Sequence, residues 1–241
     1  MQRHAVSSSH TGCEMPIEHY GSAGAAMIYV PTSGGGVDEF AGYGLPQACR
    51  PWLEEGSLQV FAIDGWARNT LWNEALSGAE RMRAYAVYER YVADELLPWV
   101  AERTGGPPPL VVGCSFGAYV AANLLFKRPA SVAGACGLGG VYGLWHRLEG
   151  HHDETVYFHT PLEYLPRLDD PAALAAIRRT SGFAIFAAAD DEWLSSSLSM
   201  ADIMRRKSLP HTLDLWPSPA DHHEQWWRRQ LAVFLVRRFG G

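Results

Sequence analysis

The chain has 241 residues, of which 47 % are hydrophobic and 19 % are charged, and its formal net charge is −6. This length suits one domain with a sizeable core, and the apolar content excludes a largely disordered chain. The acidic balance argues against a general nucleic-acid-binding protein, because there is no basic excess to neutralise phosphates.

The N-terminal segment and the cysteines bear on where the protein works. Residues 1–14 are expected to form a flexible tail, because they begin as a polar stretch rich in serine and histidine. They lack the apolar stretch of a signal peptide, and no run approaches the roughly 20 apolar residues of a membrane-spanning helix. The four cysteines form neither a disulfide framework nor a metal-ligand pattern, which favours a reducing compartment. We therefore expect a cytoplasmic protein whose single domain spans residues 15–241.

Short apolar runs bounded by glycine and proline recur along the chain and predict buried strands. In order, these runs are Ala25–Val30, Leu58–Ile63, Leu110–Gly113, Val132–Leu138, Phe183–Ala189 and Thr212–Trp216. Segments with helical periodicity lie between or after them: Gly78–Thr104, Ser115–Lys127, Pro171–Arg179, Ser195–Ser208 and Glu224–Arg238. This alternation predicts an α/β fold, a three-layer α/β/α sandwich around a mostly parallel sheet. The functional residues of such a sheet are expected in the loops after the carboxyl ends of its strands.

The segment Gly113–Gly117 (GCSFG) matches the pattern G-x-S-x-G between a predicted strand and a predicted helix. Such a sharp turn exposes the serine hydroxyl, here that of Ser115, and the glycines let neighbouring backbones approach closely. The helix that follows supplies free N–H groups and a positive dipole end for a developing oxyanion. Cys114 occupies the x position of the motif and is expected to be a buried residue.

The glycine-rich segment Pro31–Gly36 (PTSGGG) follows the strand predicted from Ala25 and is expected to complete an oxyanion hole. We expect the donors to be the N–H of Phe116 and that of Ser33 or Gly34. A phosphate-binding loop is the competing interpretation. It lacks support, because neither G-x-x-x-x-G-K-[ST] nor G-x-G-x-x-G occurs.

Along the chain, hydrolases with this turn have the order serine, acid, histidine. Three consecutive carboxylates follow the strand predicted from Phe183 and leave the choice of acid open: Asp190, Asp191 and Glu192. Two adjacent histidines, His222 and His223, follow the last predicted strand, and only one of them can face Ser115. A metal site built from His222–Glu224 and His151–Asp153 is an alternative, but no H-E-x-x-H or similar spacing supports it. No metal and no cofactor is implied.

With these residues identified, the chain resembles the esterase family of α/β-hydrolases that includes esterase D, enterobactin esterases and mycolyltransferases, and most closely its small single-domain bacterial members. The resemblance spans roughly residues 25–238 and is carried by Pro31–Gly35, Leu71–Asn73, Gly113–Ala118, Tyr157–Pro166 and Asp221–Arg229. It implies Ser115 as nucleophile, and His222 as its base when Trp227–Arg229 is held in register. It implies Glu192 as the acid, because Ala189 takes the place of a strand-ending glycine, whereas a shift of one residue would make the acid Asp191.

The segment 143–170 has no obvious strand and is expected to form a cap over the site. Aromatic and histidine side chains in loops near the site are candidate substrate contacts: Trp72, Tyr157, His159 and Trp193. The leading hypothesis is a serine hydrolase that cleaves a small-molecule or peptide-like carboxylic ester through an acyl-enzyme on Ser115. An acyltransferase with the same acyl-enzyme, or a weakly active hydrolase-like protein that serves as a binding module, are the alternatives. No nucleic-acid partner and no membrane span are expected, and the sequence does not indicate an oligomeric state.

Overall fold

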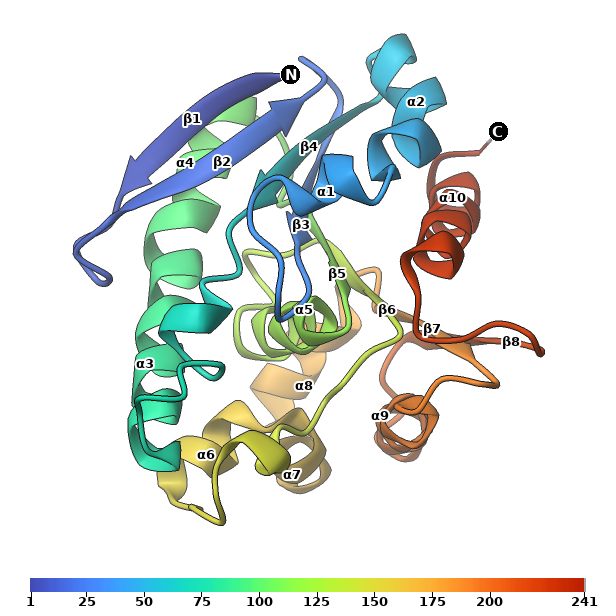
Figure 1. Ribbon diagram of the computed structural model, residues 1–241. Helices are drawn as coiled ribbons and strands as arrows, with labels where there is room; N and C mark the ends of the chain where they lie inside the picture. The colour runs from blue at the N-terminus through green and yellow to red at the C-terminus, as the bar shows by residue number, and fades with distance from the viewer. Residues whose placement is uncertain (241) are drawn as a thin grey trace.

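A single eight-stranded sheet runs through the molecule in the computed structural model, which describes residues 1–240 (Figure 1). Its strands are β1 (Gln2–Ser7), β2 (Glu14–Tyr20), β3 (Ala25–Val30), β4 (Leu58–Ile63), β5 (Leu110–Cys114), β6 (Gly134–Leu138), β7 (Phe183–Ala188) and β8 (His211–Trp216). Their spatial order is β1-β2-β4-β3-β5-β6-β7-β8; β2 is antiparallel to both of its neighbours, and all other neighbouring strands are parallel. The six strands predicted from the sequence correspond to β3 through β8, which confirms the mostly parallel α/β architecture.

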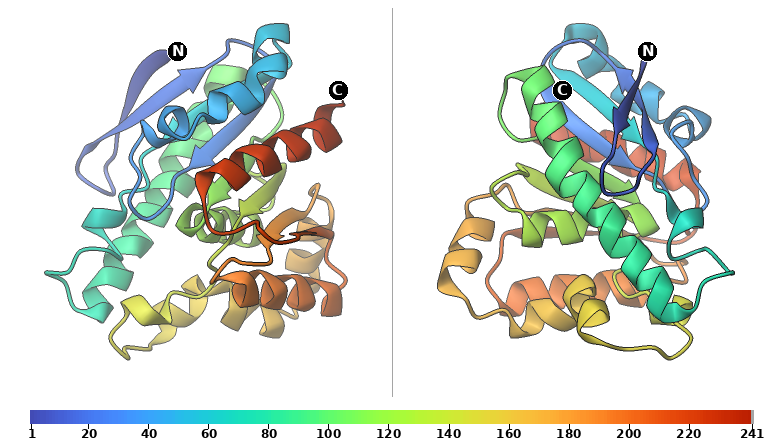
Figure 2. Two further views of the ribbon diagram at one scale, coloured as in Figure 1. Left: turned by 45° about the vertical axis from the view of Figure 1, so that its right-hand side comes forward. Right: turned by 90° about the vertical axis from the view of Figure 1, so that its left-hand side faces the viewer.

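Helices cover both faces of the sheet, and this explains why the central strands are apolar along their whole length. One face is packed by α1 (Glu39–Gly42), α2 (Leu45–Glu55) and α10 (Glu224–Phe239), and α2 and α10 lie side by side in Figure 2. The opposite face is packed by α3 (Gly78–Tyr91), α4 (Leu97–Thr104), α5 (Phe116–Lys127) and α9 (Leu194–Arg206). Between these layers every residue of β4 and of β5 is buried.

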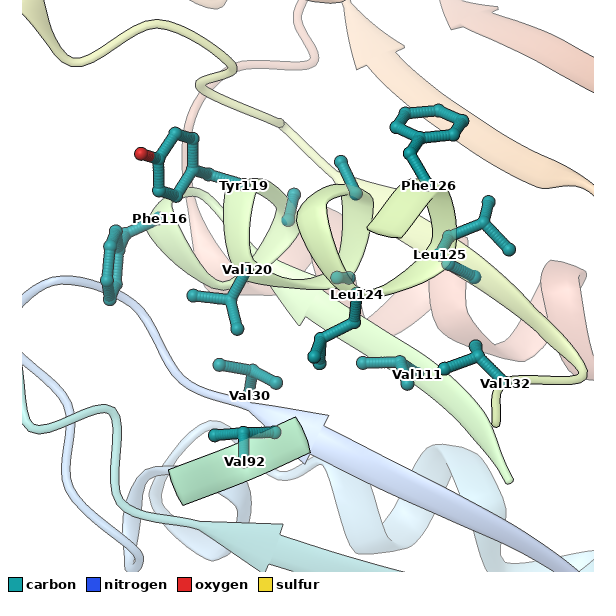
Figure 3. Packing of buried hydrophobic residues seen from close by; sticks show 14 of the residues in the cluster. Val30, Val92, Val111, Phe116, Tyr119, Val120, Leu124, Leu125, Phe126 and Val132 are labelled. Atoms are coloured by element: carbon teal, nitrogen blue, oxygen red, sulfur yellow. The ribbon is translucent and has the colours of Figure 1, made fainter. Parts of the chain in front are cut away.

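The helix α5 is buried on all sides from Phe116 to Phe126. Figure 3 shows its side chains packed among Val30, Val92, Val111 and Val132, which belong to the sheet and the neighbouring segments. Each large apolar side chain buried in this way contributes about 1.5–3 kcal/mol to folding. Because α5 cannot move without disrupting this packing, its first turn is a rigid support for the residue that precedes it.

The long predicted helix over Gly78–Thr104 is divided into α3 and α4 by a π turn, η2 (Val92–Leu96). Pro98 lies just beyond this turn and cannot donate a backbone hydrogen bond, so the helix is interrupted where a donor is missing. The cap-like segment 143–170 contains a 3₁₀ turn, η3 (Trp145–Arg147), and the helices α6 (Glu154–His159) and α7 (Pro161–Arg167). The remaining elements are η1 (Ala67–Asn69) and α8 (Pro171–Arg178).

The expectation of a flexible tail over residues 1–14 is wrong. Residues Gln2–Ser7 form β1, which pairs along its whole length with β2, and β2 in turn pairs with β4. Apolar side chains at alternate positions of these strands reach the core, among them Val6, Met15 and Ile17. Most of the other side chains are polar, and one of them, Glu18, is buried and pairs with Arg3. The segment therefore has a polar sequence although its backbone is part of the sheet. No helix within residues 1–240 is both long enough and apolar enough to cross a membrane.

Candidate active site

Ser115 lies at the sharp turn between β5 and α5, with φ 52° and ψ −114°. A non-glycine residue with this backbone is strained by about 1–3 kcal/mol, and such strain persists only where the surroundings enforce it. A Cβ atom at Gly113 would lie 2.1 Å from the backbone of Gly117, and one at Gly117 would lie 2.1 Å from the carbonyl oxygen of Val30. Glycine is therefore required on both sides of Ser115. Cys114 points into the core, where burial raises the pKa of its thiol, so it is no rival nucleophile.

The hydroxyl of Ser115 meets one of the two adjacent histidines. Its Oγ lies 3.0 Å from Nε2 of His222, and Nδ1 of the same ring lies 3.0 Å from both carboxylate oxygens of Asp191. The side chain of Asp191 is 2 % exposed and that of His222 is 20 % exposed. A carboxylate only accepts hydrogen bonds, so Nδ1 carries the proton and Nε2 is left to accept from the serine hydroxyl. This arrangement can take a proton from Ser115 and stabilise the resulting imidazolium.

The three consecutive carboxylates have three different partners. Asp190 accepts a hydrogen bond of 2.6 Å from the hydroxyl of Ser218, so it fastens the loop after β7 to the loop after β8. Asp191 faces His222 and also accepts from the backbone N–H of Trp193 at 2.7 Å. Glu192 is exposed and accepts from the indole N–H of Trp193 at 3.1 Å.

The assignment of Glu192 as the acid, which the resemblance implies, is therefore contradicted. The chain turns directly after β7, where the N–H of Asp191 bonds to the carbonyl of Ala188 at 3.2 Å. That turn directs Asp191 inward and leaves the following residue, Glu192, on the outside. Asp191, the acid expected from a shift of one residue, is the carboxylate that contacts His222.

Two neighbours hold the ring of His222 in place. Trp227, on the first turns of α10, packs its ring edge-to-face against the imidazole, with 5.0 Å between centroids. Gly139, just after β6, has φ 56°, and a Cβ there would lie 3.0 Å from Oδ2 of Asp191 and 3.2 Å from Nδ1 of His222. His223 points elsewhere and pairs with Glu224 at 2.8 Å. Sequence reasoning missed Gly139, and its one signal was a glycine at the carboxyl end of a predicted strand.

The backbone N–H groups of Phe116, Ser33 and Gly34, all near the elbow, make no hydrogen bond within residues 1–240. The Phe116 group opens α5, where the helix dipole favours negative charge. The loop that carries the other two begins beside the same turn, because Gly117 packs against the carbonyl oxygens of Val30 and Pro31. The sequence predicts the N–H of Phe116 and that of Ser33 or Gly34 as oxyanion donors, and the structure leaves each of these groups available to donate to a ligand.

The loop from Ser33 borders two adjoining cavities of about 310 Å³ and about 560 Å³. Arg68 lines both cavities, and Trp72 lines the larger one, with its ring 5.0 Å from that of Phe116. Trp193 lies in the loop after β7, two residues beyond Asp191. Its ring packs against His146 of the cap-like segment, with 5.1 Å between centroids. Trp72 and Trp193 thus border the site, and the turn η3 connects them, because Arg147 lies over the ring of Trp72.

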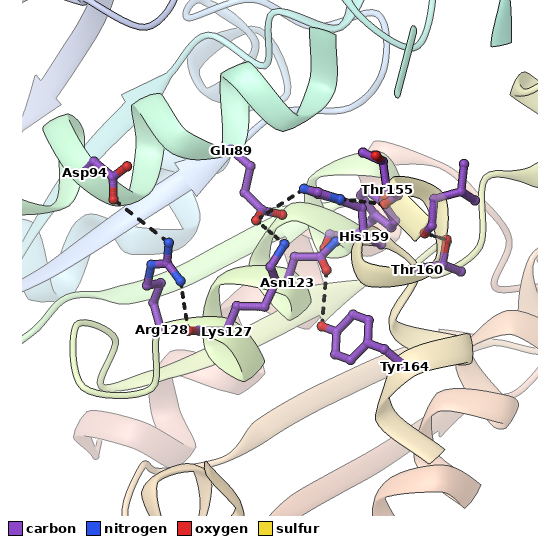
Figure 4. A network of polar contacts seen from close by, with 11 residues as sticks. Glu89, Asp94, Asn123, Lys127, Arg128, Thr155, His159, Thr160 and Tyr164 are labelled. Atoms are coloured by element: carbon purple, nitrogen blue, oxygen red, sulfur yellow. Dashed lines mark hydrogen bonds and ion pairs between the residues drawn. The ribbon is translucent and has the colours of Figure 1, made fainter. Parts of the chain in front are cut away.

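His159 and Tyr157 lie elsewhere, and their expected role as substrate contacts is not supported. Figure 4 shows His159 within a network of buried polar groups, with Nδ1 bonded to the carbonyl of Thr155 at 2.7 Å and Nε2 3.7 Å from Glu89. Tyr157 packs against Phe158 and lies under the guanidinium of Arg167. The cause is that α6 and α7 pack on α3, α5 and α9, so most of the cap-like segment belongs to the helical layer.

The alternative of a metal site has no geometric support in the described part of the chain. Within residues 1–240 no group of three or more histidine, cysteine, aspartate or glutamate side chains is placed to hold a metal ion. His151 pairs with Asp153 at 2.9 Å, and His152 pairs with Glu163 at 2.7 Å.

No protein-family model matches the chain, and no curated protein matches it in sequence. Solved structures match over nearly its whole length. A ferulic acid esterase covers 99 % of this chain and 98 % of its own at 13 % identity, with a TM-score of 0.76. An S-formylglutathione hydrolase from Agrobacterium tumefaciens covers 98 % and 92 % at 13 % identity, with a TM-score of 0.75.

MPT51 (FbpC1) from Mycobacterium tuberculosis covers 100 % of this chain and 98 % of its own at 15 % identity, with a TM-score of 0.73. At these identities the likeness concerns the fold. The eight-stranded, mostly parallel sheet with helices on both faces, together with these TM-scores over nearly the whole chain, gives the chain the α/β-hydrolase fold.

Proposed function

We propose that this protein is a serine hydrolase that cleaves a carboxylic ester through an acyl-enzyme on Ser115. The observation that carries the proposal is the line of contacts from Asp191 through His222 to Ser115, with 3.0 Å at each step. Similar triads recur on unrelated folds and are recognised by geometry and roles. The fold of known esterases adds support by analogy, although a fold alone does not determine function.

Acylation begins when Oγ of Ser115 attacks the ester carbonyl carbon and its proton passes to Nε2 of His222. The carbonyl oxygen becomes an oxyanion, which accepts hydrogen bonds from the N–H of Phe116 and from the loop amides of Ser33 and Gly34. Asp191 stabilises the imidazolium and holds its orientation. When the tetrahedral intermediate collapses, the bond to the alcohol oxygen breaks and His222 gives that oxygen its proton.

Deacylation repeats these steps with water as the nucleophile. His222 takes a proton from the water while its oxygen attacks the acyl carbon, and the same amides hold the second oxyanion. The intermediate then collapses, the acid is released, and the proton returns to Oγ of Ser115. An alcohol in place of water would make the same site an acyltransferase, and comparison of the two acceptors in solution distinguishes these outcomes.

The substrate we propose is a small-molecule or peptide-like ester. The cavities beside Ser33 and Gly34 offer room for one part of such a molecule, and Trp72 offers an aromatic wall next to the oxyanion donors. We further propose a cytoplasmic location, in line with the free thiols of all four cysteines.

The test combines active-site labelling with ester turnover. We expect a fluorophosphonate probe to label Ser115 in the wild-type protein, and His222→Ala to abolish both labelling and hydrolysis of p-nitrophenyl esters. The matched control is His223→Ala, which removes the adjacent exposed histidine and is expected to keep activity. A folded wild-type protein that is neither labelled nor able to hydrolyse any ester of a broad panel would overturn the proposal and favour a binding module.

A further inference from the structure

Glu39 is a buried carboxylate that the proposed reaction does not use. It is the first residue of α1, three residues after Gly36 of the glycine-rich loop, and it is 7 % exposed. Oε1 accepts hydrogen bonds from the hydroxyl of Tyr29 at 2.7 Å and from the N–H of Thr32 at 2.8 Å. Oε2 accepts from the hydroxyl of Thr32 at 2.5 Å. One side chain thus joins strand β3 to the start of the loop.

The charge of Glu39 is held without a cation. Within residues 1–240 the side chain makes no ion pair with lysine, arginine or histidine, so its stabilisation comes from the three donated hydrogen bonds. Burial raises the pKa of Glu39, and the bonds from Thr32 and Tyr29 act in the opposite direction. A buried carboxylate is costly when it only fills space, and an apolar side chain would serve that purpose better.

The loop is shaped around this carboxylate. A Cβ atom at Gly35 would lie 1.9 Å from Oε2 of Glu39, so only glycine lets the backbone pass so close. The N–H of Gly35 bonds back to the carbonyl of Thr32 at 3.1 Å and closes the turn. The carboxylate and the loop backbone therefore occupy adjacent positions with no space for another side chain.

These contacts divide four consecutive backbone N–H groups into two kinds. The group of Thr32 is bonded to Glu39, and that of Gly35 is bonded to the carbonyl of Thr32. The two groups between them, of Ser33 and Gly34, make no hydrogen bond within residues 1–240. Anchoring both ends of the turn keeps the two middle amides available for a ligand. Preorganised donors of this kind stabilise a transition state because they need no reorientation during the reaction.

We propose that Glu39 is a positioning residue that holds the loop amides of Ser33 and Gly34 in the orientation that binds the oxyanion. The inference rests on the proposed hydrolase function. It assigns to Glu39 an effect on the transition state that acts through Thr32, with no contact to the substrate. A merely structural role would lower stability and leave the reaction parameters of the folded protein unchanged.

The experiment compares two substitutions of the same side chain. Glu39→Met keeps a long side chain but removes both acceptors, whereas Glu39→Gln keeps an oxygen for Thr32 and Tyr29 and an NH₂ that can donate to the Thr32 hydroxyl. We expect Glu39→Met to lower kcat by about 100-fold, as for loss of an oxyanion donor, with little change in KM. We expect Glu39→Gln to restore most of the lost kcat.

The affinities of two inhibitors provide a measurement that a loss of stability alone would not change. A boronic acid forms a tetrahedral adduct with Ser115 and mimics the oxyanion, whereas the carboxylic acid product binds without one. Glu39→Met is expected to weaken the binding of the boronic acid by a factor close to the loss in kcat and to leave inhibition by the product unchanged. The matched control is Glu89→Met on α3, an equally buried carboxylate paired with Lys127, which is expected to lower Tm without these effects.

The outcomes are separable. Wild-type turnover together with a folded Glu39→Met variant of unchanged kcat and boronic acid affinity would overturn the inference and leave the proposed function standing. A wild-type protein with neither turnover nor labelling overturns the proposed function itself. If Glu39→Met does not fold, Tyr29→Phe decides, because it removes one anchor of the carboxylate and is expected to lower kcat several-fold at constant KM. An unchanged kcat in Tyr29→Phe then contradicts the inference.

Discussion

The imidazole Nδ1 of His222 lies 3.0 Å from both carboxylate oxygens of Asp191, on a side chain that is almost completely buried. The next residue, Glu192, carries the same charge but is exposed and reaches only the indole of Trp193. Two adjacent carboxylates thus differ in environment because the chain turns between them. Asp191 and Glu192 therefore provide a variant and its control at neighbouring positions.

Asp191→Asn is expected to lower kcat by about 10³–10⁴-fold with the fold intact, because an amide at this position no longer favours the productive tautomer of His222. Steady-state kinetics with a p-nitrophenyl ester measure the loss. Glu192→Gln is expected to stay within about threefold of the wild-type kcat, since Glu192 is exposed and Gln keeps an oxygen that can accept from the indole of Trp193. A larger loss in Glu192→Gln than in Asp191→Asn would reverse the assignment of the acid.

Gly139→Ala is expected to reduce both Tm and kcat, since its φ of 56° and its closeness to Asp191 and His222 leave no room for a methyl group. The displaced imidazole should cost about 10-fold to 100-fold in kcat, because small misplacements of catalytic groups are expensive. Gly56→Ala is the control, because Gly56 also has a positive φ, 78°, but has no atom within 4 Å of a Cβ. It should lower Tm alone, and equal kcat losses in both variants would contradict the proposed steric cause.

The buried network around His159 predicts a pH dependence of stability. Burial lowers the pKa of His159 from 6.5, with Lys127 acting in the same direction and Glu89 in the opposite one. As the pH falls below 6.5, the unfolded chain gains a proton that the folded chain resists, so the free energy of unfolding decreases.

His159→Asn retains a donor for the carbonyl of Thr155 and removes this titration. Denaturant unfolding at about pH 7.5 and about pH 5.5 is expected to show a smaller decrease for the variant than for the wild type. His223→Asn, at an exposed position, controls for the substitution itself. A decrease as large in His159→Asn as in the wild type would rule out His159 as its source.

Deletion of residues 1–7 removes β1 and leaves the edge of β2 unpaired, with Met15 and Ile17 more exposed. We expect a lower Tm and a greater tendency to aggregate, because an exposed strand edge pairs with other chains. Thermal unfolding and light scattering of the shortened and full-length chains measure both effects. Unchanged behaviour would mean that the N-terminal strand contributes nothing to stability.

Strands β3 to β7 were predictable because they are almost completely buried, and a strand covered on both faces must be a continuous apolar run. The edge strand β8 also has a short apolar run, although Leu213 and Leu215 are exposed. The strands β1 and β2 were not predictable, because the edge of the sheet requires only alternate apolar residues and their polar side chains resemble a tail. The elbow at Ser115 was also predictable, since close backbone contacts restrict it to a short local pattern with glycines at both ends.

By itself, the sequence determined the α/β architecture, the turn that carries Ser115, and the two short segments that hold the acid and the histidine. These properties depend on local periodicity and on neighbouring residues, which a single sequence records. Only the tertiary structure decided that Asp191 and His222 face each other, that His159 joins Glu89 instead of the site, and that Glu39 supports the loop at Thr32. The physical reason is that each of these contacts joins segments that only the packing of the sheet and its helices brings together, and the sequence alone carries no record of such distances.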